Sequence, residues 1–204
     1  MDSVYVFDLG NVIISPMNTK LLYEMLETQV SYEDFLKYFF KSKSSIDAHK
    51  GLISDDENIQ NILDFCGSSK TIEEYKEIYG GPIRNSLNKD TLDIMENLRA
   101  QNKKIYMLSN LRKIDFDYLA SVYDVSQFDG LFLSYEMHKL KPDLDIYLEM
   151  IEHLKVKPNQ IHFFDDNKEN CDAAKKCGIN SYCVTGENIK NVYKKKIMRE
   201  EEVR

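Results

Sequence analysis

Short apolar runs that alternate with helical patterns are the feature that most constrains the fold of this chain. Five runs rich in Val, Ile, Tyr and Phe are each ended by polar or turn residues, as buried strands of a parallel sheet are. Amphipathic helical patterns lie between the later runs, for example over 90–101 and 143–154. Because strand and helix alternate, the sequence predicts an α/β fold with a parallel sheet. The predicted strands are Val4–Phe7, Ile105–Leu108, Leu131–Leu133, Ile161–Phe164 and Tyr182–Val184.

The interval between the first two strands is too long for one crossover connection. It carries several amphipathic patterns, broken by the turn signals Lys50-Gly51 and Gly80-Gly81-Pro82. We interpret it as an inserted helical module, docked on the main domain because no linker rich in Pro, Gly or Ser joins the two. The helical patterns span 19–27, 32–40, 55–65 and 72–79.

Composition restricts the class of protein. A chain of 204 residues can bury one main core with a small inserted module. No window has the ~18 uninterrupted apolar residues of a membrane span, and the acidic start does not resemble a secretory signal, so we expect a soluble, cytoplasmic protein without a membrane partner. The formal net charge of -7 argues against a nucleic-acid partner. The run Lys194–Lys196 is interpreted as part of a solvated terminal helix.

Unusual polar residues follow three of the predicted strands directly. Asp8 follows the first, Ser109-Asn110 the second, and Asp165-Asp166 the fourth. In an open parallel sheet the carboxyl ends of the strands converge on one ligand-binding crevice. Acids brought together there repel one another unless a cation lies between them. Oxygen ligands favour Mg²⁺, and the chain offers none of the Cys or clustered His ligands of zinc.

Lys141 completes a set of groups that suits phosphoryl transfer. Pro142 follows it and predicts a rigid turn that fixes the ammonium group. A carboxylate nucleophile, a hydroxyl, an amide, a lysine and a metal together neutralise the charge that develops on a transferred phosphoryl group.

At these residues the sequence resembles the haloacid dehalogenase-like hydrolase superfamily over nearly the whole chain. Its four motifs appear in order as FDLGNVI, LSN, KPD and FFDDNKEN. The resemblance implies a three-layer Rossmann-like core over 1–14 and 88–204, with a helical cap over 15–87. It also implies a phosphatase that forms an aspartyl phosphate on Asp8 and uses Mg²⁺. Phosphate would be bound by Ser109, Asn110 and the catalytic Lys141, and the metal by Asp8, the Gly10 carbonyl, Asp165 and Asp166, with Asn170 in a supporting role.

Within the superfamily, FDLGNVI and HKGLISDDE most resemble the bacterial α-glucose-1-phosphate phosphatases and the phosphatase domain of epoxide hydrolases. The implied substrate is therefore a small phosphorylated metabolite of the sugar-phosphate kind. Gly10 departs from the family pattern, because most of its phosphatases carry a general acid-base Asp there. We expect slow or selective turnover that favours acidic leaving groups.

Two other functions and several structural interpretations stay open. A haloacid dehalogenase also lacks the second Asp, although the pair Asp165-Asp166 argues against it, and a catalytically silent binding protein would explain Gly10. Asp8, Ser109-Asn110 and the acidic pair also suit turns and helix caps, and Asn170 a helix surface. The sequence makes no prediction of oligomeric state. We interpret the cysteines as reduced core thiols; they are Cys66, Cys171, Cys177 and Cys183. We assign none of the histidines, His49, His138, His153 and His162, to catalysis, although His49 in the cap could contact substrate.

Overall fold

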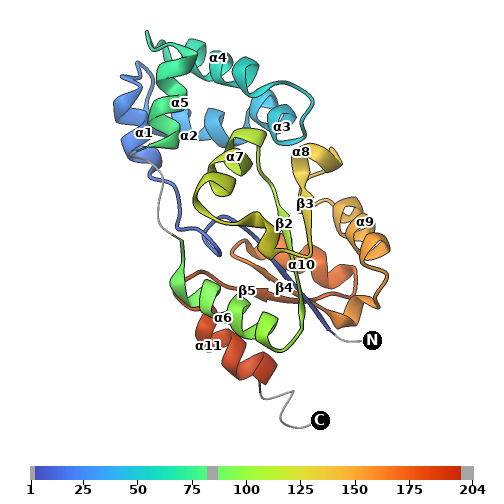
Figure 1. The fold of residues 1–204 in the computed structure, drawn as a ribbon. Helices are drawn as coiled ribbons and strands as arrows, with labels where there is room; N and C mark the ends of the chain where they lie inside the picture. Colours follow the sequence, from blue (N-terminus) through green and yellow to red (C-terminus); the bar gives the residue numbers. More distant parts are fainter. Residues whose placement is uncertain (1–2, 82–86, 199–204) are drawn as a thin grey trace.

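Five parallel strands form one sheet at the centre of the molecule (Figure 1). The computed structural model describes residues 3–81 and 87–198, and in this part of the chain the strand order is β3-β2-β1-β4-β5. At the centre of the sheet, Phe7 lies in register with Met107 on one side and Phe164 on the other. The predicted parallel α/β fold is confirmed. The strands are Val4–Phe7 (β1), Lys104–Ser109 (β2), Gly130–Leu133 (β3), Ile161–Asp165 (β4) and Asn180–Cys183 (β5).

Helices cover both faces of the sheet and complete the three layers. Successive side chains of a strand point to opposite faces, so Tyr5 and Phe7 enter one apolar cluster while Val4 and Val6 enter another. The first cluster takes up residues of α6, α7 and α11, and the second takes up residues of α9 and α10. These helices span Lys89–Ala100 (α6), Lys113–Val122 (α7), Leu144–Leu154 (α9), Lys168–Lys176 (α10) and Ile189–Tyr193 (α11).

The last strand differs from its prediction. It begins at Asn180, two residues before the predicted start, because the backbone of Asn180 pairs with His162 of β4. An edge strand is partly exposed, so polar residues are tolerated in it while their backbone atoms pair with the neighbouring strand. Val184 lies just outside the strand, yet its N–H still donates to Asp165 O at 2.9 Å. The C-terminal prediction is confirmed, because Lys194–Lys196 are exposed in the helical segment Lys194–Met198 that follows α11.

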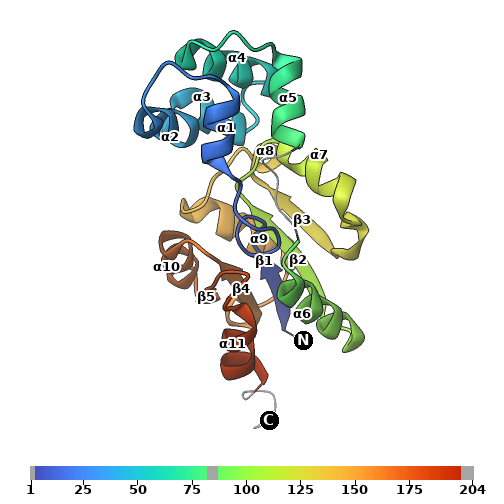
Figure 2. The ribbon, with the colours of Figure 1, turned by 90° about the vertical axis from the view of Figure 1, so that its left-hand side faces the viewer.

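The helices of the long interval pack together at one end of the molecule (Figures 1 and 2). Their shared apolar cluster is separate from the two that flank the sheet and includes Leu22, Phe35, Ile62 and Tyr75. A hydroxyl side chain caps the start of four of the five helices. The second of these four, over 43–49, is absent from the predicted set. The helices are Thr19–Met25 (α1), Tyr32–Lys41 (α2), Lys43–His49 (α3), Asp55–Cys66 (α4) and Ile72–Gly80 (α5).

The sheet and the helices that cover its two faces are called the sheet domain below. Two chain segments that connect α1–α5 to the sheet domain lie side by side. Ile14 forms an isolated antiparallel bridge with Leu87, and the Asn88 N–H donates to Ile13 O at 2.8 Å. We propose that the predicted cap over 15–87 joins the core of 1–14 and 88–204 at this place. Residues 1–2, 82–86 and 199–204 of these predicted segments, with Pro82 of the turn signal, lie outside the described residues.

The prediction of buried thiols holds for two of the cysteines. Cys66 and Cys171 are buried, whereas Cys177 is partly exposed and Cys183 is exposed. Cys183 ends β5, which is an edge strand of the sheet in the described part of the chain, and its exposure shows that its interpretation as a core residue is wrong. All four thiols are free. In the described part of the chain, no helix is both long and apolar enough to cross a membrane.

Candidate active site

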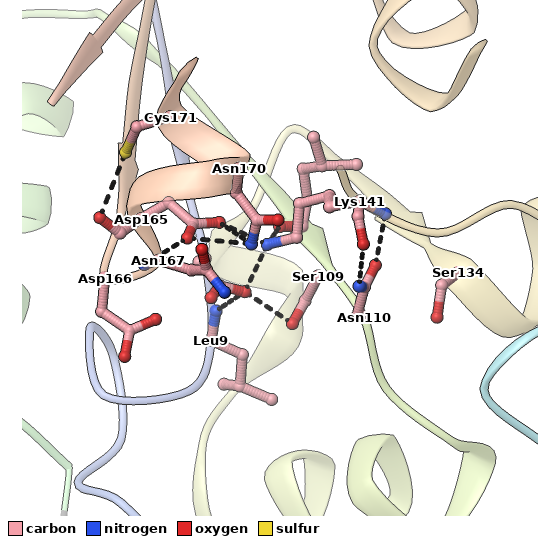
Figure 3. A network of polar contacts seen from close by, with 12 residues as sticks. Leu9, Ser109, Asn110, Ser134, Lys141, Asp165, Asp166, Asn167, Asn170 and Cys171 are labelled. Carbon is pink, nitrogen blue, oxygen red and sulfur yellow. Dashed lines mark hydrogen bonds and ion pairs between the residues drawn. The ribbon is translucent and has the colours of Figure 1, made fainter. Parts of the chain in front are cut away.

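The carboxyl ends of three neighbouring strands bring the predicted polar residues together. Asp8 follows β1, Ser109 ends β2 and Asp165 ends β4. The Asp8 N–H donates to Phe164 O at 2.9 Å, so the sheet ladder itself fixes the start of the loop that carries this carboxylate. Figure 3 shows the side chains of Ser109 and Asp165 converging with those of Lys141 and Asn170.

The Asp8 carboxylate is buried and held at one oxygen. Its Oδ1 accepts hydrogen bonds from the Leu9 N–H and Ser109 Oγ, both at 2.8 Å, and pairs with Lys141 Nζ at 2.9 Å. Burial and the nearby charge of Asp165 raise the pKa of Asp8 to about 6, although Lys141 opposes the shift. Burial therefore disfavours the ionised form of Asp8 despite the contact with Lys141, and its second oxygen has no protein partner among the described residues.

Lys141 is a buried ammonium with fixed partners. Its Nζ donates to Asp165 Oδ2 at 2.6 Å and to Leu108 O at 3.0 Å. Burial alone would lower the pKa of Lys141, but the charges of Asp8 and Asp165 raise it, so the ammonium form is retained. The Asn110 side chain binds the backbone of Lys141 at two points. Its Nδ2 donates to Lys141 O at 2.7 Å, and its Oδ1 accepts from the Lys141 N–H at 2.8 Å. The Asn110 side chain thus positions Lys141, and its predicted phosphate contact stays a prediction.

The two acids of FFDDNKEN have different environments. Asp165 is fully buried, and its carboxylate accepts from the Asn167 N–H at 2.8 Å and from Asn170 Nδ2 at 3.1 and 3.2 Å. Asp166 is only partly buried, and it accepts from Asn11 Nδ2 at 3.0 Å. Asn170 is itself buried, so the helix-surface interpretation of this residue is wrong and it orients Asp165 instead.

The donor set fits a divalent cation with oxygen ligands. Asp8, Asp165 and Asp166 each present a carboxylate oxygen, and these oxygens lie within 4.8 Å of one another. The three carboxylates and the single ammonium of Lys141 leave two excess negative charges, which one dication would balance. Hard oxygen donors of this kind favour Mg²⁺. Gly10 lies beside them and is exposed, and its carbonyl as a metal ligand stays a prediction.

A cavity of about 160 Å³ opens between the sheet domain and the α1–α5 helices. Leu9, Gly10, Ser109 and Asn110 form its floor, and the apolar part of its wall includes Met17, Phe39 and Phe40. A cavity of about 150 Å³ holds a molecule the size of benzene. The cavity, which Leu9 and Ser109 line next to Asp8, therefore fits a leaving group of a few carbon atoms.

Sequence reasoning missed a buried arginine in the same wall. Arg112 is 3% exposed and donates from Nε to Asp115 Oδ2 at 3.2 Å and from Nη1 to Asn58 Oδ1 at 3.1 Å. Its guanidinium also lies over the rings of Phe39 and Tyr79, at 5.6 and 4.8 Å from their centroids. Burial alone would lower the pKa of Arg112, but Tyr79 and Asp115 raise it well above its usual value. Two residues after Asn110, Arg112 thus joins α4 and α5 to the sheet domain.

The sequence matches the haloacid dehalogenase-like hydrolase family over residues 5–184. The chain belongs to this family. The resemblance found in the four motifs is thereby confirmed, and with it the prediction of a hydrolase. The motif residues that gave the resemblance are the ones that meet at the strand ends.

Among relatives, a D-ribitol-5-phosphate phosphatase from Bacteroides thetaiotaomicron is 27% identical, with 87% of this chain and 89% of the relative covered. A sesquiterpene phosphatase from Aspergillus oryzae is 26% identical, with 85% of each chain covered. The crystal structure of a family enzyme from Bacteroides thetaiotaomicron with magnesium and inorganic phosphate has a TM-score of 0.78 at 23% identity, covering 91% of this chain and 96% of the other. The predicted Mg²⁺ agrees with that complex, and the α/β core with its fold.

Proposed function

We propose that this protein is a Mg²⁺-dependent phosphatase that hydrolyses the phosphate monoester of a small hydroxylated metabolite, such as a sugar or sugar alcohol, through an aspartyl phosphate on Asp8. The observation that carries the proposal is the arrangement of Asp8. Its carboxylate is bound by Ser109 and Lys141 on one side and lies beside Asp165 and Asp166 on the other. Such a group is suited to attack an electrophile whose negative charge must be neutralised.

The chain's own residues supply most of the proposed mechanism. Asp8 attacks phosphorus while the Lys141 ammonium and the Ser109 hydroxyl stabilise the phosphoryl oxygens. Asp165 and Asp166 would hold Mg²⁺, which supplies positive charge that offsets the repulsion between the carboxylate and the phosphate. The bond from phosphorus to the leaving oxygen breaks, and this oxygen takes a proton from water in the cavity beside Gly10. A second water then hydrolyses the aspartyl phosphate at phosphorus, which releases inorganic phosphate and restores Asp8.

The size and lining of the cavity support the proposed substrate class. A volume of about 160 Å³ suits a leaving group of a few carbons better than one as large as a sesquiterpene. The wall includes the polar side chains of His49, Arg112 and Asn110. Asn110 and Arg112 already have protein partners, so His49 is the one of these three whose side chain a substrate hydroxyl group can pair with. The relative at 27% identity is named for a pentitol phosphate, D-ribitol 5-phosphate, and such a substrate agrees with this chemistry.

The acidic pair argues against haloacid dehalogenation. A haloacid is an anion, and without a cation Asp165 and Asp166 would repel its carboxylate from Asp8. The pKa of Asp8 is raised chiefly by burial, and the charge of Asp165 adds to the shift, so a further anion beside this carboxylate is disfavoured. A phosphate ester that arrives with Mg²⁺ relieves that repulsion.

Phosphate release tests the proposal. The purified protein is assayed with a panel of sugar, sugar-alcohol, alkyl and aryl phosphates and with acetyl phosphate, with Mg²⁺ and with a chelator. We expect turnover that requires Mg²⁺ and is lost in Asp8→Asn and reduced at least ~10²-fold in Asp166→Asn. Asp117→Asn, on the exposed surface of α7, is the matched control and should retain full activity. A folded protein that releases no phosphate from any of these esters would contradict the proposal and favour a binding protein.

A further inference from the structure

His49 lies at the end of α3 and is fixed at both its backbone and its side chain. Its carbonyl oxygen accepts a hydrogen bond from Ser134 Oγ at 2.7 Å. Its Nδ1 lies 2.7 Å from Ser45 O, one turn earlier in the same helix. Because a carbonyl oxygen only accepts hydrogen bonds, Nδ1 carries the proton, and Nε2 of the neutral ring is left as an acceptor.

The charge state of the ring is set by its surroundings. Burial lowers the pKa of His49, and the positive charge of Arg112 lowers it further, against the weaker opposing effects of Asp115 and of the hydrogen bond to Ser45. The imidazole is therefore neutral at physiological pH. Its Nε2 lone pair is available to a donor.

The segment after His49 is held against the sheet domain. Lys50 O accepts from the ring of His138 at 2.7 Å, and Gly51 lies so close to Tyr135 that a Cβ on the glycine would come within 2.1 Å of Tyr135 O. Both Ser134 and Tyr135 belong to the short helix α8 (Ser134–Met137). The imidazole is therefore a fixed feature of the cavity wall, held from two sides.

Several other polar groups of the cavity wall are already bound by the protein. Asp115 accepts from the Tyr79 hydroxyl at 2.6 Å and from the guanidinium of Arg112. The hydroxyl of Ser109 donates to Asp8, and that of Ser15 donates to Asn88 at 3.3 Å. Nε2 of His49, by contrast, has no protein donor among the described residues. It is an acceptor that a ligand in the cavity can satisfy.

We infer that His49 is the residue that selects hydroxylated substrates, because its Nε2 accepts a hydrogen bond from a hydroxyl group of the leaving alcohol. The inference rests on the proposed phosphatase function and names how its substrate class is recognised. His49 is partly exposed in the free protein, so a substrate that covers Nε2 without offering a hydroxyl leaves this atom unpaired, which costs binding energy. His49 contacts the leaving group and takes no proton in this assignment, so its loss acts mainly on KM.

Three phosphate esters separate this role from others. One is an open-chain pentitol phosphate, the second is pentyl phosphate, which has the same carbon chain without hydroxyl groups, and the third is 4-nitrophenyl phosphate. The variants are His49→Leu, which removes the acceptor, and His49→Gln, whose Oε1 reaches about the position of Nε2. Circular dichroism and thermal unfolding check that both variants fold.

We expect His49→Leu to lower kcat/KM for the pentitol phosphate about tenfold, mainly through KM, and to change the other two esters less than about twofold. His49→Gln should recover part of the loss. An equal loss with all three esters, or no loss with the pentitol phosphate, would overturn the inference. A loss confined to the two alkyl esters would indicate proton transfer to the leaving group and would also overturn it.

The proposed function is judged separately, by Asp8-dependent turnover of 4-nitrophenyl phosphate in the protein with His49 intact. If that turnover is present and the hydroxyl dependence is absent, only the inference about His49 fails. If the protein with His49 intact hydrolyses none of the three esters, the proposed function fails and the inference falls with it.

Discussion

Burial and the contact with Lys141 shift the pKa of Asp8 in opposite directions. Burial raises the pKa of its carboxyl to about 6, and Asp165 adds to the shift, while Lys141 opposes it. A metal-free protein therefore takes up a proton at Asp8 as the pH falls through about 6, whereas a bound cation needs the carboxylate.

We predict that the apparent affinity for Mg²⁺ is constant above about pH 7 and falls up to about tenfold for each pH unit below about 6, because protons then compete for Asp8. Isothermal titration calorimetry across this range measures it. Asp8→Asn, which has no proton to exchange, should bind more weakly and without this slope. Affinity that stays constant down to pH 5 would contradict the prediction.

Gly10 lies at the position where most phosphatases of the superfamily carry a general acid-base Asp. A Cβ added at Gly10 meets nothing within 4 Å, and its φ is outside the positive range that disfavours side chains. We predict that Gly10→Asp raises kcat for alkyl phosphates by up to about 10²-fold, because a general acid then protonates the leaving oxygen. Aryl and acyl phosphates should gain much less.

Gly10→Asn has the same shape without the acid and is the matched control in steady-state assays. If Gly10→Asp and Gly10→Asn have equal kcat for alkyl phosphates, the absence of a general acid at this position does not limit the rate. Lower rates for Asp alone would show that added negative charge beside Asp8 outweighs any catalytic gain.

At the residue scale, the sequence identified the groups that follow strands. Asp8, Ser109 and Asp165 were predicted because the ends of parallel strands must converge. Lys141 was predicted from its turn and motif. Arg112 and the acceptor role of His49 were not predicted, because they depend on which side chains of the α1–α5 helices face the sheet domain.

At the scale of elements, the docking of the turn after α3 on α8 depends on a backbone position that only glycine suits. Gly51 has a φ of 65°, and its missing Cβ makes room for Tyr135 O. We predict that Gly51→Ala lowers the free energy of unfolding by about 1–3 kcal/mol, because the alanine is strained and displaces the turn from α8. Urea unfolding measures it.

Gly80→Ala is the matched control, because Gly80 ends α5 with open space around it. We expect it to be neutral or to stabilise the protein by up to about 1 kcal/mol. Equal stability of the two alanine variants would show that the contact between Gly51 and Tyr135 does not constrain the fold.

The helices and strands differ in how well their sequences predict them. The buried strands β1 and β4 were predicted to within one residue, because both their faces are apolar. The start of β5 was missed because Asn180 is polar and pairs only through its backbone. Helix α3 was missed because Ile46 and Ala48 are its only apolar residues, too few to mark a helical period.

At the scale of the whole molecule, the buried pair of Arg112 and Asp115 ties the α1–α5 helices to the sheet domain. Asp115 compensates the buried guanidinium, which also reaches Asn58 in α4. We predict that Asp115→Ala lowers the free energy of unfolding by about 3–5 kcal/mol, because it leaves a buried charge unpaired. Chemical denaturation measures the change.

Asp117→Ala, in the same helix, removes the exposed partner of Lys113 and should cost less than about 1 kcal/mol. If both variants lose the same small amount, the buried pair does not hold the two parts together.

For the whole molecule, the length of the interval after β1 was enough to predict an inserted helical module. Its apolar periodicity predicted that it has a core of its own. How the module sits on the sheet domain depends on contacts such as Arg112 with Tyr79 and Ser134 with His49, which join residues far apart in the chain. No local pattern marks such contacts, so the cavity between the two parts appears only in the structure.

The most direct test of the central claim is to trap the phosphorylated enzyme. The protein is mixed with a radiolabelled phosphate ester and Mg²⁺, quenched in acid within one turnover, and digested for mass spectrometry. Our account predicts a phosphoryl group on the peptide that contains Asp8, absent in Asp8→Asn and absent without Mg²⁺. Turnover that proceeds undiminished in Asp8→Asn, or label found on another residue, would contradict it.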